Sequence, residues 1–140
     1  MKLFIGLGNY GDQYAHTRHN AGFEVIDRLS DRWHIPVTRA RCHGLIGEGT
    51  VGGERVALIK PQTYMNLSGD CVAAAMQWYK VQPQDVMIFS DDIDLELGTL
   101  RVRPFGGSGT HNGWRDILLK TGSDRFPRIR IGVGARPTFW

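Results

Sequence analysis

Apolar residues along this chain follow two different spacings, and the change between them predicts the secondary structure. Short apolar or alternating runs are typical of strands, whereas apolar residues three or four positions apart are typical of a helix. The predicted strands cover residues 3–7, 45–51, 55–60, 86–89, 100–103 and 128–133. The predicted helices cover residues 21–33 and 69–79, and a third carries Trp114, Ile117 and Leu118 on its apolar face.

The segments are separated by residues that end helices or turn the chain. Pro36 follows the first helix, and Gly52-Gly53 predicts a two-residue turn that joins its flanking strands in a hairpin. Ser68 is predicted to be the N-cap of the second helix. Because strands alternate with helices, we expect an α/β fold. Its form is a three-layer α/β sandwich around a mixed, mostly parallel central sheet, in one domain spanning residues 1–140.

Polar side chains follow the predicted strands where these end. They are Asn9 and His19, then Asn66, then Asp91, and finally His111 and Asn112. Because the carboxyl ends of strands in such a sheet meet at one edge, we expect these side chains to converge there. A histidine beside a carboxylate can activate water as a general base, and asparagine amides can stabilise an oxyanion. The pattern therefore favours a hydrolytic site.

Composition limits the classes of function. The chain is 41% hydrophobic, has no apolar run of about 18 residues and carries no cleavable signal pattern, so we expect a cytoplasmic protein outside the membrane. Cys42 and Cys71 fit no metal spacing and are predicted to be reduced and structural. The net charge is +3, and the positive charge is concentrated after residue 100. This basic segment is either a phosphate-contact surface or a solvated basic face.

Three further patterns have competing interpretations. Gly6, Gly8 and Gly11 spell the glycine spacing of a dinucleotide site, but no helix opens at the third glycine, so we expect no such cofactor. The carboxylates at 91–94 lack accompanying ligands with metal-site spacing, so we expect no metal. The glycine-rich segment 106–113 predicts either a backbone cradle for an anion or a hinge.

Five ordered motifs extend over essentially the whole chain. They are GLGNYGDQYAHTRHN, KPQTYMNLSG, DDID, GGSGTHNG and RIRIGVG. This sequence resembles the bacterial peptidyl-tRNA hydrolase family, whose members carry G-L-G-N-P-G with Y and T-R-H-N, K-P-x-T-Y-M-N-x-S-G, D-D-x-D, G-G-x-G-G-H-N-G and R-x-R-I-G-x-G. The resemblance implies an esterase without metal or cofactor that releases the peptide from peptidyl-tRNA by using activated water.

The resemblance also implies individual roles. His19 would be the general base, Asp91 would hold its basic form, and Asn9 would recognise the blocked peptidyl end. The substrate-binding residues would be Tyr14, Tyr64, Asn66, His111 and Asn112: the asparagines position the ester and terminal ribose, and the tyrosines line the path of the tRNA acceptor end. Arg103 and Arg130 would contact the tRNA 5′-phosphate, which agrees with the basic bias of this part of the chain.

Several positions depart from the family pattern. Tyr10 replaces a proline, Ser90 stands where a histidine is common, and Thr110 replaces a glycine. Members of the family continue beyond the position of Trp140, so we expect this chain to lack a final helix and lid. Its full-length relatives are expected to be monomers, whereas this chain is expected to self-associate or to dock its own tail. These departures leave a non-catalytic RNA-binding relative of the same fold as the alternative function.

Overall fold

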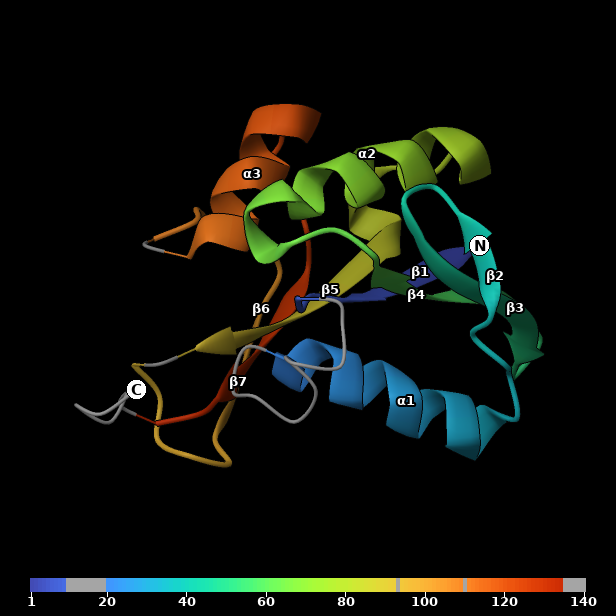
Figure 1. Ribbon diagram of the computed structural model, residues 1–140, viewed down its shortest axis with the longest axis horizontal. Helices are drawn as coiled ribbons and strands as arrows, with labels where there is room; N and C mark the ends of the chain where they lie inside the picture. The colour runs from blue at the N-terminus through green and yellow to red at the C-terminus, as the bar shows by residue number, and fades with distance from the viewer. Residues whose placement is uncertain (10–19, 93, 110, 135–140) are drawn as a thin grey trace.

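A computed structural model describes residues 1–9, 20–92, 94–109 and 111–134 of the chain (Figure 1). His19 and Tyr14, which the sequence assigns to the site, lie outside these residues. So do Tyr10, Thr110 and the terminal Phe139-Trp140, so the predictions made for them stay predictions. Among the helices of the described part, none has the length and apolar character needed to cross a membrane.

Seven strands form one sheet in the order β2-β3-β4-β1-β5-β7-β6. The central strands β4, β1, β5 and β7 are parallel, whereas β3 and β6 run antiparallel to their neighbours. The sheet is therefore mixed, as predicted, but three of its neighbouring strand pairs are parallel and three are antiparallel, so the predicted mostly parallel pairing holds only for the four central strands. The strands are β1 (Lys2–Gly6), β2 (Arg39–Arg41), β3 (Gly44–Val51), β4 (Glu54–Pro61), β5 (Val86–Asp92), β6 (Leu100–Arg103) and β7 (Arg128–Gly132).

Helices cover both faces of the sheet and complete the three-layer α/β sandwich (Figure 1). α1 (Ala21–Trp33) lies on one face, and α2 (Ser68–Tyr79) and α3 (Asn112–Thr121) lie together on the other. Two short 3-10 turns, η3 (Met65–Leu67) and η4 (Pro83–Asp85), precede α2 and β5. The predicted fold class is confirmed.

Alternating side chains of the strands divide the core into two layers. In β1, Leu3 and Ile5 pack toward α2 and α3, whereas Phe4 packs with the α1 layer. In β4, Ala57 and Ile59 belong to the first layer, and Val56 and Leu58 belong to the second. Period-two alternation with both faces apolar is what a central strand between two helix layers requires.

Local structure agrees with the sequence at most boundaries and differs at three. Gly52 and Gly53 have φ of +56° and +83° and form the predicted turn between β3 and β4. The N-cap prediction for Ser68 is wrong: Leu67 is the N-cap, and the Ser68 hydroxyl donates to the Met65 carbonyl oxygen over 2.7 Å. β2 was not predicted, because an exposed three-residue edge strand leaves no apolar pattern. β5 continues through Asp92, so its carboxylates belong to the strand end.

The chain order places the ends of three central strands at one edge of the sheet. From β1 the chain passes through α1, β2 and β3 to β4 on one side of β1, and from β4 it crosses through α2 to β5 on the other side. Open α/β sheets hold ligands beside the carboxyl ends of strands at such a switch point. The edge formed by β1, β4 and β5 is therefore where a site is expected.

Candidate functional site

A cavity of about 300 Å³ opens at this edge of the sheet. Its walls come from the ends of β1 and β5, from η3, from the glycine-rich loop and from the start of α3. The lining residues are Asn9, Met65, Asp91, Asp92, Asp94, Ser108, Gly109, His111, Asn112, Trp114 and Arg130. An adjoining hollow shares Asn9, Met65 and Asn112 with this cavity and adds Tyr64 and Asn66. The predicted strand-end residues that the structure describes therefore converge at this edge of the sheet.

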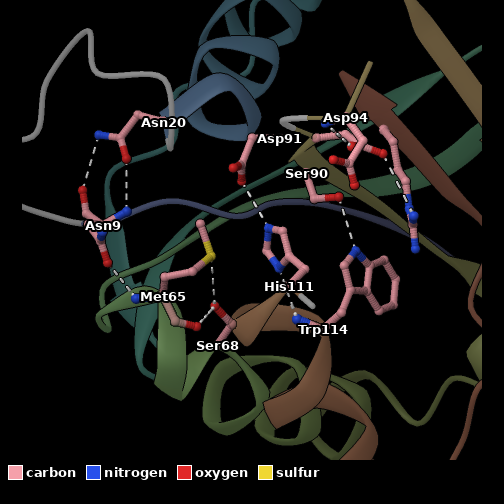
Figure 2. A network of polar contacts seen from close by, with 11 residues as sticks. Asn9, Asn20, Met65, Ser68, Ser90, Asp91, Asp94, His111 and Trp114 are labelled. Atoms are coloured by element: carbon pink, nitrogen blue, oxygen red, sulfur yellow. Dashed lines mark hydrogen bonds and ion pairs between the residues drawn. The ribbon is translucent and has the colours of Figure 1, made fainter. Parts of the chain in front are cut away.

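Asn9 is held from two directions by hydrogen bonds (Figure 2). The Asn20 side chain accepts from the Asn9 backbone N–H (2.8 Å) and donates to the Asn9 carbonyl oxygen (3.1 Å). The Asn9 side-chain oxygen accepts from the Met65 backbone N–H. Because that contact occupies Oδ1, the amide's Nδ2 amino group is the donor that Asn9 can offer to a ligand in the cavity.

His111 and Asp91 form a fixed pair across the same cavity (Figure 2). His111 Nε2 lies 2.9 Å from Asp91 Oδ1, and Nδ1 accepts from the Trp114 backbone N–H over 3.2 Å. Since Nδ1 accepts, the neutral ring carries its proton on Nε2 and donates it to the carboxylate. Asp91 is only 3% exposed, so this bond lies where solvent competes weakly. Both ring nitrogens of His111 are therefore committed within the protein.

The start of α3 fits closely around His111. His111 is the N-cap of the helix, and a Cβ at Gly113 would lie 2.9 Å from the ring and 2.7 Å from Met65 Sδ. Only glycine allows this approach, because real Cβ atoms do not come so near. The fully buried Trp114 donates its indole N–H to Ser90 Oγ over 3.0 Å. Ser90, a departure from the family pattern, is therefore tied to the helix that carries His111.

The far wall of the cavity is charged. Arg130 lies 3.7 Å from the Asp92 carboxylate and donates to the Gly107 carbonyl oxygen over 3.3 Å. Asp92 in turn accepts from the Asp94 backbone N–H over 2.8 Å, which forms a turn at the end of β5. The charged groups at this end of the cavity are thus ordered by one another.

Four arginines share one face of the sheet at its β6–β7 edge. Antiparallel register sets Arg101 opposite Arg130 and Arg103 opposite Arg128, so all four point to the α3 side. Arg101 and Arg103 are exposed on the edge strand, whereas Arg128 is buried. Burial lowers the pKa of the Arg128 guanidinium to about 10, with a further lowering by the charge of Arg130. The cations at 103 and 130 are thus near diagonal neighbours, although Arg103 does not line the cavity.

The hydrogen bonds of the glycine-rich loop leave both predictions for it, the anion cradle and the hinge, as predictions. The Gly106 N–H donates to the Asp124 carbonyl oxygen (3.0 Å), and the Trp114 N–H at the start of α3 is taken by His111. The loop instead turns its Gly106 and Gly107 carbonyl oxygens toward arginine donors. Its backbone therefore recognises guanidinium groups of the same chain, which the glycine content alone did not indicate.

The sequence missed several residues that build the site: Asn20, Met65, Ser90, Trp114 and Arg128. The sequence does contain an indication that Asn20 belongs to the site, because Asn20 follows His19 directly and precedes the first helix. The sequence predicts Met65 as a loop residue and Trp114 as a core residue, because no sequence pattern reports that their backbone N–H groups bind Asn9 and His111. Cys42 and Cys71 are free thiols. Within the described ranges, no group of three or more His, Cys, Asp or Glu side chains could hold a metal ion.

Comparison with known proteins identifies the family. The family model for peptidyl-tRNA hydrolase matches residues 3–139. A peptidyl-tRNA hydrolase of Alkaliphilus oremlandii is 52% identical over 139 residues, covering 99% of this chain and 75% of that protein. One of Geobacillus thermodenitrificans is 53% identical over 138 residues, covering 99% and 74%. A crystal structure of peptidyl-tRNA hydrolase from Acinetobacter baumannii superposes with a TM-score of 0.93 at 40% identity, covering 99% of this chain and 70% of that one. This chain therefore belongs to the peptidyl-tRNA hydrolase family.

Proposed function

We propose that this protein hydrolyses the ester bond of peptidyl-tRNA and releases free tRNA and peptide. The observation that carries this proposal is one cavity in which the Asn9 amide and the Asp91–His111 pair are both fixed by hydrogen bonds. Fixed neutral donors beside a buried carboxylate suit acyl transfer to water, because charge develops on the ester oxygen in the transition state. With tRNA as its substrate, we propose the cytoplasm as its location.

The amide side chains would bind the ester. Asn9 offers its Nδ2 donor, and Asn112 lines both hollows, whereas Asn66 lines only the one that also holds Tyr64. We assign Asn9 to the carbonyl groups of the blocked peptidyl end, and Asn66 and Asn112 to the ester and the terminal ribose. Tyr64, 45% exposed at the rim, offers a ring face to the acceptor end.

We assign the general base to His19. Of the histidines in the described part of the chain, only His111 lines the cavity, and both of its ring nitrogens are already engaged. A base needs an unprotonated nitrogen within reach of the attacking water. The neighbour of His19 in the chain, Asn20, is anchored to Asn9 beside the cavity, which supports the assignment.

Asp91 would act through charge. His111 is one of its partners. Its proposed effect on His19 is electrostatic, because a buried carboxylate in the cavity favours the positive charge that the base acquires. Arg130 at the cavity and Arg103 on the neighbouring strand would contact tRNA phosphate groups. Neither contact requires a metal or cofactor.

The direct test is incubation with N-acetyl-aminoacyl-tRNA, with released N-acetyl amino acid as the readout. We expect release of the N-acetyl amino acid, and we expect it to require His19. The control is His34→Ala, which changes an exposed histidine at the end of α1 and should leave release unaffected. Aminoacyl-tRNA with a free amino group is the substrate control and should be cleaved more slowly. Tight tRNA binding without release would instead favour the non-catalytic RNA-binding alternative.

A further inference from the structure

Arg128 is a buried cation whose hydrogen-bond partners are all neutral. The residue is 1% exposed at the start of β7. Its guanidinium donates to four backbone carbonyl oxygens: those of Gly106 (2.6 Å), Gly107 (2.9 Å), Asp124 (3.3 Å) and Phe126 (3.2 Å). Two of these acceptors are consecutive residues of the glycine-rich loop.

This arrangement is costly for folding. Taking a cation out of water carries a desolvation penalty that neutral acceptors repay only in part, and replacing a buried charge by an apolar group is often neutral or stabilising. The depressed pKa of the guanidinium reflects the same penalty. Stability of the core alone therefore does not account for an arginine here.

An arginine can do two things at this position that no other side chain combines. Its planar fork binds several carbonyl groups in fixed directions, and its flat face stacks on an aromatic ring. The Arg128 guanidinium carbon lies 3.7 Å from the centre of the Trp114 ring. One side chain thereby holds both the loop that leads to His111 and the tryptophan whose backbone N–H donates to the His111 ring.

Trp114 connects this contact to the catalytic cavity. Its backbone N–H donates to His111 Nδ1, and its indole N–H donates to Ser90 Oγ, next to Asp91 in β5. The bond to Nδ1 selects the ring tautomer in which Nε2 donates to Asp91. A displaced Trp114 would therefore change both the position and the proton arrangement of the Asp91–His111 pair.

We propose that Arg128 is a positioning residue for the reaction: by binding Gly106 and Gly107 and stacking on Trp114, it fixes His111 and Asp91 in the catalytic cavity. The Gly107 carbonyl oxygen also accepts from Arg130. The loop thus joins the buried arginine to the arginine proposed to bind phosphate. This inference rests on the proposed hydrolase function for its kinetic test, but its structural test is independent of it.

The variants Arg128→Met and Arg128→Lys separate fold from position. Met keeps the length and removes the buried charge, whereas Lys keeps the charge and removes the planar fork. We expect both proteins to fold, with Arg128→Met at least as resistant to urea as the unmodified protein. In both, kcat for N-acetyl-aminoacyl-tRNA should fall roughly ten- to hundredfold, the effect of a small misplacement of catalytic groups, while KM changes little.

Arg125 provides the matched control. It is an exposed arginine of the same segment that stacks on Phe105 at 5.1 Å and pairs with Asp124 at 3.6 Å. Arg125→Met and Arg125→Lys should leave kcat unchanged.

The second readout is the ¹⁵N spectrum of the His111 ring. It should report the Nε2–H tautomer in the unmodified protein and in the Arg125 variants, and a mixture of tautomers in the Arg128 variants. If the unmodified protein releases no N-acetyl amino acid, the proposed function fails, whereas the ring spectrum still tests the positioning role.

Three results would overturn the inference. The first is a folded Arg128 variant whose kcat is within twofold of the unmodified protein. The second is a loss confined to KM, since that would make Arg128 a binding residue. The third is failure of both variants to fold, since Arg128 would then support the whole domain and not the site.

Discussion

The two sides of the cavity hold their reactive groups by different means. On the Asn9 side, Asn20 and the Met65 backbone fix a neutral amide through neutral hydrogen bonds. On the other side, Asp91 and His111 meet through a bond whose direction depends on which ring nitrogen carries the proton. Figure 2 shows both sets of contacts in one view.

The difference assigns separate tasks to the two sides. Amide hydrogen bonds do not change with protonation, so the Asn9 side can present the same donor over a wide pH range. The Asp91 side supplies a negative charge in a buried, low-dielectric position. The start of α3 fixes the His111 ring and thereby determines which ring nitrogen donates to that carboxylate. Among the described residues, neither side contains a histidine nitrogen without a hydrogen-bond partner. We therefore assign the general base to His19.

The largest effect should come from removing that base. His19→Ala is expected to lower kcat roughly 10²–10⁴-fold, the usual loss when a general base is removed, without changing tRNA affinity. Release of N-acetyl amino acid gives the rate, and His34→Ala is the control. If His19→Ala keeps most of its activity while His111→Ala loses it, the Asp91 side supplies the base and the comparison is wrong.

A smaller effect is expected from Asp91→Asn. The amide oxygen can still accept from His111 Nε2–H, but the charge is lost. Hydrogen bonds to charged groups exceed neutral ones by about 1–1.5 kcal/mol, so kcat should fall roughly tenfold. Single-turnover hydrolysis measures the chemical step directly. Unchanged kcat with an intact fold would remove the Asp91 charge from the mechanism.

On the amide side, Asn20→Ala removes two hydrogen bonds to the Asn9 backbone. Leaving those partly buried groups without partners should lower the free energy of unfolding by about 1 kcal/mol and raise KM for the blocked substrate. Asn20→Asp is the companion variant, because it keeps an acceptor for the Asn9 N–H, loses the donor to the Asn9 carbonyl oxygen and adds a negative charge. Urea unfolding and steady-state kinetics report the two effects. Equal stability of all three proteins would show that Asn20 does not hold Asn9.

The smallest effect concerns the β6–β7 edge, where Arg130 reaches the cavity wall and Arg103 lies outside it. Arg103→Ala and Arg130→Ala should each reduce the slope of log K against log salt for tRNA binding by about one unit and spare kcat. Arg39→Ala, on the exposed strand β2 at the opposite edge of the sheet, is the control and should leave the slope unchanged. Wild-type salt dependence in both variants would make the basic segment a solvated face.

The sequence predicted the frame of this site well. The continuous apolar runs of β1 and β4 indicate strands buried on both faces, and the four-residue spacing in α1 indicates its buried face; burial of apolar area is what drives those elements together. Because the elements alternate along the chain, the ends of β1, β4 and β5 had to meet, and with them Asn9, Asn66 and Asp91. That inference needs only local patterns and the chirality of connections between strands.

The hydrogen-bond partners were decided by tertiary structure. Nothing in the sequence indicates that Asp91 pairs with His111, that Asn20 clamps Asn9, or that Arg128 is buried while Arg103, opposite it in the register, is exposed. Periodicity specifies the face on which a side chain lies, but a hydrogen bond requires positions set to within a few tenths of an ångström. Those positions depend on register, helix start and side-chain packing together, which the chain acquires only when it is folded.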